Sequence, residues 1–210
     1  MKRSALTRTR SFCSSAGQAA AIAFACWSSS PGTQAQEALP TRNCTWCHGS
    51  SAQGFSTAPR IAGQKPHYIV RELLAFKDHS RDNPTSAQYM WGATARVSPE
   101  LASEFAAYFA ALPAEPANDG NSALVEAGKA LYVQGAAEAN VVSCVVCHGP
   151  NGEGFEAIPR LGGLSYGYLK SRLEQWSQGF HASAYPMPRV ATSLSPEEID
   201  ALASYLSFLK

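Results

Sequence analysis

Two segments of this 210-residue chain, one hundred positions apart, repeat the same cysteine, histidine, proline and arginine residues. The first reads CTWCHGSSAQGFSTAPRIAG over residues 44–63, and the second reads CVVCHGPNGEGFEAIPRLGG over residues 144–163. Cys-x-x-Cys-His is the attachment signature of c-type haem, in which two thiols bond the porphyrin and the histidine binds its iron. The pattern therefore predicts two covalently bound haem c groups. Their attachment residues are Cys44, Cys47, His48, Cys144, Cys147 and His148.

Other uses of a Cys-x-x-Cys pair fit this chain less well. A structural zinc site places its two pairs about 15–20 residues apart, whereas 96 residues separate these two pairs. A thioredoxin-like redox motif belongs to a βαβ unit, and strand signals here are few. Disulfide pairing in an exported protein is a further alternative, but it would not require a histidine after each pair.

Methionines are the best candidates for the second axial ligand of each iron. Apart from Met1 the chain has two, Met90 and Met187, which lie 42 and 39 residues after the motif histidines. Both come shortly before the last helix expected in each copy, where a loop can cover the other haem face. His79 is the alternative ligand if Met90 does not bind. His/Met ligation raises the reduction potential and fills both axial positions, which favours electron transfer over activation of small molecules.

The proline and arginine residues that follow each motif suggest supporting roles. The carbonyls of Pro59 and Pro159 are expected to accept the proton on the other histidine nitrogen and so fix the ring. Arg60 and Arg160 are expected to neutralise haem propionates by charge-assisted hydrogen bonds. An ordinary surface charge is the alternative for each arginine.

The repeated segments are part of a longer duplication. Between Cys44 and Phe76, 11 of 33 positions are identical to those one hundred residues later, and beyond them the offset becomes 97. Residues 113–122 are rich in proline, glycine and asparagine, which is typical of a linker. We predict an N-terminal domain over residues 36–115 and a C-terminal domain over residues 116–210.

The first 35 residues differ in composition from the rest. They hold four basic and no acidic residues, a short apolar run of about a dozen residues, and small residues up to Ala35. This layout is typical of a signal peptide, and the run is short for a bilayer core of about 30 Å. We expect cleavage after Ala35 and export to the periplasm. The remaining chain has 13 basic and 16 acidic residues, which does not suggest nucleic-acid binding.

Local patterns predict an all-α protein. Ser98-Pro99 and Ser195-Pro196 are N-cap and first-turn pairs, and Glu198 completes a capping box. Apolar residues then recur at helical spacing after both pairs. Middle helices are expected over 68–79 and 168–177. An opening helix is expected over 122–133 in the second copy, whereas eight residues separate Ala35 from Cys44 in the first.

With these residues in view, the chain resembles the cytochrome c4 family over residues 40–210. The resemblance rests on CTWCHG and CVVCHG, on PRIAGQ and PRLGG, and on MWGATARVSPE and MPRVATSLSPE. It implies two tandem class I cytochrome c domains, each a small helical fold wrapped around a haem. It also implies Pro59 and Pro159 as partners of the haem histidines, and Gly128 as the glycine at which the opening and closing helices cross, near Tyr205.

The same resemblance implies a function. Family members are electron-transfer proteins rather than enzymes, and carry single electrons in the periplasm between respiratory or dehydrogenase donors and a terminal oxidase or reductase. Such a carrier would be a monomer that meets membrane complexes peripherally. The alternative is the dihaem electron-accepting subunit of a periplasmic dehydrogenase such as flavocytochrome c sulfide dehydrogenase. A dihaem peroxidase would need an accessible iron, and two retained methionines argue against it.

Overall fold

A computed structural model describes residues 39–210 of the chain. The predicted signal peptide and its cleavage after Ala35 lie outside these residues. From Ala38 onward the chain forms one unit. Helices account for all its regular elements within the described range, beside two isolated β-bridges, so the all-α prediction is confirmed.

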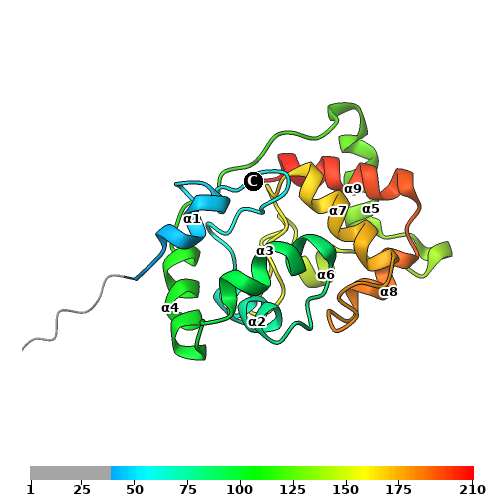
Figure 1. The fold of residues 1–210 in the computed structure, drawn as a ribbon. Helices are drawn as coiled ribbons and strands as arrows, with labels where there is room; N and C mark the ends of the chain where they lie inside the picture. Colours follow the sequence, from blue (N-terminus) through cyan, green and yellow to red (C-terminus); the bar gives the residue numbers. More distant parts are fainter. Residues whose placement is uncertain (1–38) are drawn as a thin grey trace, which may run out of the picture. The chain divides into compact units, whose positions relative to one another are not determined.

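The first copy contains four of these helices (Figure 1). They are α1 Arg42–His48, α2 Pro66–Lys77, α3 Pro84–Thr94 and α4 Pro99–Ala110. The second copy contains five α-helices and two short 3-10 helices. They are η1 Ser122–Leu124, α5 Val125–Gln134, η2 Ala137–Ala139, α6 Val145–His148, α7 Tyr166–Ser177, α8 Met187–Thr192 and α9 Pro196–Phe208.

The closing helices α4 and α9 begin where the sequence predicts. Ser98 accepts a hydrogen bond from the backbone N–H of Leu101 at 3.2 Å. Ser195 accepts from the N–H of Glu198 at 3.2 Å and donates its own N–H to the Glu198 carboxylate at 2.8 Å. The second helix therefore has the complete capping box, which satisfies one more backbone donor than a single cap does.

Each copy has its own buried apolar cluster. In the first, α2 packs against both α3 and α4, and the cluster includes Ile69, Phe105 and Phe109. In the second, α7 packs against α8 and α9, and the cluster includes Leu169 and Leu202. Apolar burial of this kind supplies the main driving force for folding, and here it is divided between the two halves of the duplication.

The opening helix of the second copy crosses α9 at close range. A Cβ atom added to Gly128 of α5 would lie 2.0 Å from the carbonyl oxygen of Ala201 and 2.7 Å from the Cβ of Tyr205. Only glycine permits this approach, as the resemblance predicts. Helix α5 lies beside α9 (Figure 1). Within residues 39–210 no helix precedes α1, and any opening helix of the first copy would lie outside the described residues.

Residues 113–122, predicted to be a linker from composition, are tied to both copies by hydrogen bonds. The side chain of Gln53 bonds the carbonyl of Pro113 at 2.8 Å and the N–H of Glu115 at 3.0 Å. On the other side, the N–H of Ala117 donates to Gly163 and the N–H of Asn118 donates to Ser207. The composition of this segment predicts a linker, but it does not predict the hydrogen bonds that attach the linker to both copies.

Candidate haem sites

The two motifs occupy equivalent short helices, α1 and α6. Both place their histidine at the last helical residue, where it is buried, with 8% of His48 and 5% of His148 exposed. Cys44 and Cys144 are half-buried, and Cys47 and Cys147 are exposed. All four are free thiols rather than disulfides, so they are available for thioether bonds.

Each motif histidine is held by the carbonyl predicted for it. Nδ1 of His48 lies 2.7 Å from the oxygen of Pro59, and Nδ1 of His148 lies 3.0 Å from the oxygen of Pro159. A proton on Nδ1 donates to that oxygen and leaves Nε2 available for a metal. Burial lowers the pKa of both histidines, although the bond to the proline carbonyl acts in the opposite direction. The neutral imidazole, which is the form that binds iron, is therefore favoured.

A glycine turn brings each proline carbonyl to its histidine. Gly54 has a φ of +77°, and an added Cβ would lie 2.3 Å from the backbone nitrogen of Arg60; Gly154 has a φ of +68° and a similar clash with Ile158. Their N–H groups donate to the histidine carbonyls at 2.8 Å in both copies. Close backbone approach together with positive φ explains why both positions are glycine.

The two methionines lie in different local structures. Met187 is the first residue of α8, and Met90 lies inside helix α3. The expectation that both occupy a loop is therefore wrong for Met90, because Pro84 at the first turn starts a helix that continues to Thr94. Both methionines are half-buried. Their role as iron ligands stays a prediction, and so does the alternative role of His79, which is exposed and stacks on Trp91 at 3.9 Å between ring centroids.

The donors left over in the described residues suit a haem. Five buried polar side-chain atoms have no hydrogen-bond partner, and four of them are N–H donors, the kind of group that a propionate carboxylate accepts from. They belong to Arg60, Arg81, Arg160 and Trp176. Large apolar side chains also remain exposed at equivalent places within or after the motifs, namely Trp46, Val146, Phe55 and Phe155. Free thiols, unpaired donors and bare apolar groups together fit an apolar macrocycle with acidic substituents.

Most of the Arg60 guanidinium is engaged elsewhere. It is buried, and its terminal nitrogens donate to the backbone carbonyls of Glu115, Gly162 and Gly163 at 2.6–2.8 Å. Burial and the nearby Arg160 lower its pKa to about 10. Arg60 therefore ties the first copy to the second, which leaves its buried Nε–H and one N–H of Nη2 without a partner. The propionate role of Arg60 and Arg160 stays a prediction.

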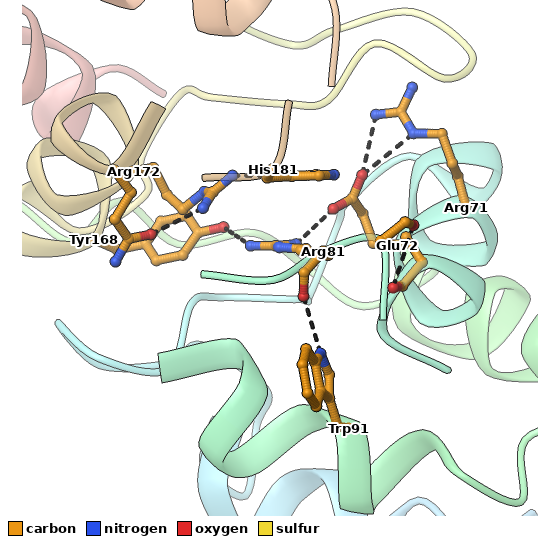
Figure 2. A network of polar contacts seen from close by, with 10 residues as sticks. Arg71, Glu72, Arg81, Trp91, Tyr168, Arg172 and His181 are labelled. Carbon is orange, nitrogen blue, oxygen red and sulfur yellow. Dashed lines mark hydrogen bonds and ion pairs between the residues drawn. The ribbon is translucent and has the colours of Figure 1, made fainter. Parts of the chain in front are cut away.

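A buried polar network also joins the two copies (Figure 2). Arg81 pairs with Glu72 at 2.6 Å and donates to the hydroxyl of Tyr168 at 3.2 Å. Nη2 of Arg172 lies 3.0 Å from Nδ1 of His181, and the backbone N–H of His181 donates to the Asp82 carboxylate at 2.6 Å. Trp91, beside Met90, donates its indole N–H to the carbonyl of Arg81 at 3.0 Å. The network therefore connects the boundary between the copies to the helix that carries Met90.

Burial and neighbouring charges determine the protonation states of Glu72 and His181 in this network. Burial alone would raise the pKa of Glu72, but Arg81 and its neighbours bring that pKa below its usual value. Burial lowers the pKa of His181 to about 4. Glu72 is thus ionised and His181 neutral near pH 7.

Sequence reasoning did not assign this network. Glu72 and Arg172 occupy equivalent positions one hundred residues apart. This pair was the available signal, because a charged side chain at the same position of both copies indicates that the duplicated surface is used.

The zinc-site alternative can now be compared with the structure. Among residues 39–210 no group of three or more Cys, His, Asp and Glu side chains is placed to hold a metal ion by itself. A zinc site therefore has no support there.

None of the helices described has both the length and the apolar character required to cross a membrane.

Known proteins resemble this chain over most of its length. The cytochrome c family model matches residues 125–210. Cytochrome c4 of Thiocapsa roseopersicina is 33% identical over 184 residues, which cover 84% of this chain and 92% of the relative. The thiosulfate dehydrogenase electron acceptor of Stutzerimonas stutzeri strain A1501 is 36% identical over 171 residues, which cover 78% of this chain and 77% of the relative.

Solved structures show the same fold. A cytochrome c4 structure from Acidithiobacillus ferrooxidans has a TM-score of 0.75 at 31% identity, and the match covers 80% of this chain and 99% of that one. The chain belongs to the cytochrome c4 family. Its two motifs accordingly bind haem c covalently, and it is an electron-transfer protein. A thiosulfate dehydrogenase from Marichromatium purpuratum also matches this cytochrome c4 family member, with a TM-score of 0.68 at 34% identity over 78% of this chain and 36% of that one.

Proposed function

We propose that this chain is a periplasmic dihaem carrier that moves single electrons between a respiratory or dehydrogenase donor and a terminal oxidase or reductase. In this proposal the leader is removed after Ala35, and residues 36–115 and 116–210 form one haem domain each. The carrying observation is that both motif histidines are buried and hydrogen-bonded to a proline carbonyl in the same way. Two equivalent haem-binding sites in one small protein suit electron transfer through both haems.

Both irons have His/Met ligation in this proposal. His48 pairs with Met90, and His148 pairs with Met187. The haem supplies reversible one-electron chemistry when bound. The chain's own residues orient the imidazoles, exclude water from the buried ring faces and supply N–H donors for the propionates. A soft thioether on the sixth position favours the ferrous state and raises the potential.

A redox-monitored absorption titration of the holoprotein tests this function. We expect two covalent haems per chain, a ferric far-red band typical of methionine–iron ligation, and two high potentials. Met90→Ala and Met187→Ala should each lower the potential of one haem only and remove about half of the band. A full-strength band in Met90→Ala would show that Met90 is not a ligand, and His79→Ala would then test the alternative.

A second candidate is an electron-accepting subunit of a thiosulfate dehydrogenase. It is favoured by the relatives of that name from Stutzerimonas stutzeri and Thiomonas intermedia, at 36% and 30% identity. Thiosulfate added with a purified thiosulfate dehydrogenase should then reduce both haems rapidly, and the two proteins should co-elute on size exclusion. Haems that stay oxidised would leave the free carrier as the function.

A further inference from the structure

The closing helix of the first copy has an exposed face that its counterpart lacks. We define the outer face of α4 as Glu104, Ala107 and Tyr108. All three are exposed, and 43% of the tyrosine is accessible. The equivalent residues of α9, at an offset of 97, are Ala201, Ser204 and Tyr205, and all are buried.

The second copy shows what kind of element covers such a face. Helix α5 crosses α9 at Gly128, directly over the carbonyl of Ala201. Tyr132 of α5 is fully buried, and its ring lies 5.6 Å from that of Tyr205. Its hydroxyl donates to the carbonyl of Gly149, next to the haem histidine, at 2.6 Å. The covering helix thus completes the surroundings of the motif as well as those of α9.

The chain leading into α5 is held by two serines of α9. The N–H of Gly120 donates to Ser207 at 3.0 Å, and the N–H of Asn121 donates to Ser204 at 3.2 Å. On α4 the equivalent residues are Ala110 and Ala107. The first copy therefore keeps the tyrosine and the small residues that receive a helix, but it lacks the hydroxyls that anchor a preceding segment of the same chain.

Charge also distinguishes the two faces. Glu104, which is exposed, stands where Ala201 contacts Gly128. A helix that crosses here meets a carboxylate in place of a methyl group. A lysine or arginine on that helix would pair with Glu104, and such complementary charges steer association and select partners. An occupant with a basic side chain at the crossing differs from α5, which has glycine there.

We propose that the outer face of α4 is the docking surface for a helix of the catalytic dehydrogenase subunit that reduces this protein, with a basic residue opposite Glu104. This inference rests on the second candidate function above. The missing hydroxyl anchors favour a helix from another polypeptide over one from this chain, and the acidic face selects a basic one. In the thiosulfate dehydrogenase from Marichromatium purpuratum, the matched region is 36% of that chain, so the module occurs there within a longer polypeptide.

The test measures binding of the holoprotein to a purified thiosulfate dehydrogenase by titration calorimetry. Ala107→Arg and Glu104→Arg should each weaken binding at least tenfold. Ala130→Arg is the matched control, because Ala130 is also an exposed helical alanine, on α5, and it should change binding less than twofold. Charge reversal of the opposing basic residue in the dehydrogenase should restore binding to Glu104→Arg. Tyr108 should become protected from oxidative labelling in the complex.

Each other outcome overturns a defined part of the proposal. Binding and haem reduction that are the same in wild type and Ala107→Arg would leave the second function intact and refute this docking surface. If wild type neither binds nor is reduced, the second function fails, and with it this partner. Labelling of Tyr108 without dehydrogenase identifies the remaining occupants. Protection that needs residues 1–35 would assign the face to the leader, and protection that rises with protein concentration would assign it to a second copy of the chain.

Discussion

The two copies of the duplicated module hold the same haem motif but cover their closing helices differently. In the second copy α9 is buried against α7 on one side and α5 on the other, whereas α4 packs against α2 and leaves Tyr108 exposed. The first copy instead extends Arg60 and Gln64 to backbone atoms of residues 160–163. In the described residues, one copy thus has an opening helix against its closing helix, and the other has bonds to its neighbour.

This difference follows from where each copy obtains its buried contacts. A domain of fewer than about one hundred residues has a small core, so contacts with a neighbouring domain add substantially to its buried surface. Here the buried Glu72–Arg81 pair and the Arg60 bonds lie at the boundary between the copies. We therefore expect the copies to respond in different ways to matched substitutions.

The largest effect is expected from adding one methyl group at the α5–α9 crossing. Gly128→Ala places a Cβ 2.0 Å from a backbone oxygen, which cannot move aside without shifting α9. We expect a loss of about 3–5 kcal/mol in the free energy of unfolding. The control is Gly92→Ala in α3, where an added Cβ meets no atom within 4 Å. Alanine there should stabilise the helix by about 0.5–1 kcal/mol. Denaturant unfolding followed by haem absorption measures both changes in the free energy of unfolding. A change of the same sign in the two variants would contradict the comparison.

Breaking the buried ion pair should have the next largest effect. Glu72→Ala leaves the Arg81 guanidinium buried with an uncompensated charge, for which we expect a loss of about 3 kcal/mol. Arg71 also pairs with Glu72, but 52% of its side chain is exposed. Arg71→Ala should therefore cost less than about 0.5 kcal/mol. If both variants lose the same stability, the buried pair with Arg81 contributes no more than the exposed pair with Arg71.

His181 should make stability depend on pH. Its pKa is lowered to about 4 by burial, against about 6.5 in the unfolded chain, so the unfolded state binds more protons between these values. Stability is then complete above about pH 6.5 and falls by roughly 3 kcal/mol as the pH drops to 4. The charged groups that act on the ring are Glu72, Arg71, Arg81 and Arg172, and the Asp82 carboxylate accepts from the backbone N–H of His181.

The check is the midpoint of urea unfolding of the holoprotein from pH 7 to pH 4. His181→Asn should flatten this dependence, since asparagine tolerates the positive φ of 53° at this position. Below pH 4 both proteins should lose stability again, because the lowered pKa of Glu72 means that acid must protonate a paired carboxylate. An unchanged slope in His181→Asn would show that the imidazole does not gain a proton on unfolding.

The smallest effect should come from the two N-caps. Ser195→Ala removes a reciprocal capping box, and Ser98→Ala removes a single cap bond. We expect losses of about 1 kcal/mol and about 0.5 kcal/mol respectively in the free energy of unfolding. Differential scanning calorimetry resolves the order of the two midpoints. A larger loss for Ser98→Ala would mean that α4 depends on its cap more than α9 does.

The elements predicted well from sequence are those whose causes are local. The middle helices were placed within two residues of their observed starts, at Pro66 and Tyr166. Ser-Pro pairs determine where α4 and α9 begin, because the capping bonds join residues three apart. Met90 is the exception. The loop expectation came from its distance before the closing helix and did not weigh the helix start at Asn83-Pro84.

The sequence by itself determined the haem motifs, the fold class and the duplication, because each depends on residue types at regular or repeated spacings, whereas the crossing glycine was predicted from the resemblance to the cytochrome c4 family. Only the tertiary structure decided that Arg60 bonds Gly162 and Gly163, that Glu72 and Arg81 pair beside Tyr168 and His181, and that Tyr108 lies exposed. These contacts join residues about one hundred positions apart, or depend on a covering helix. Spacing along a chain shows which residues are equivalent in a duplication, but it does not show which of them meet.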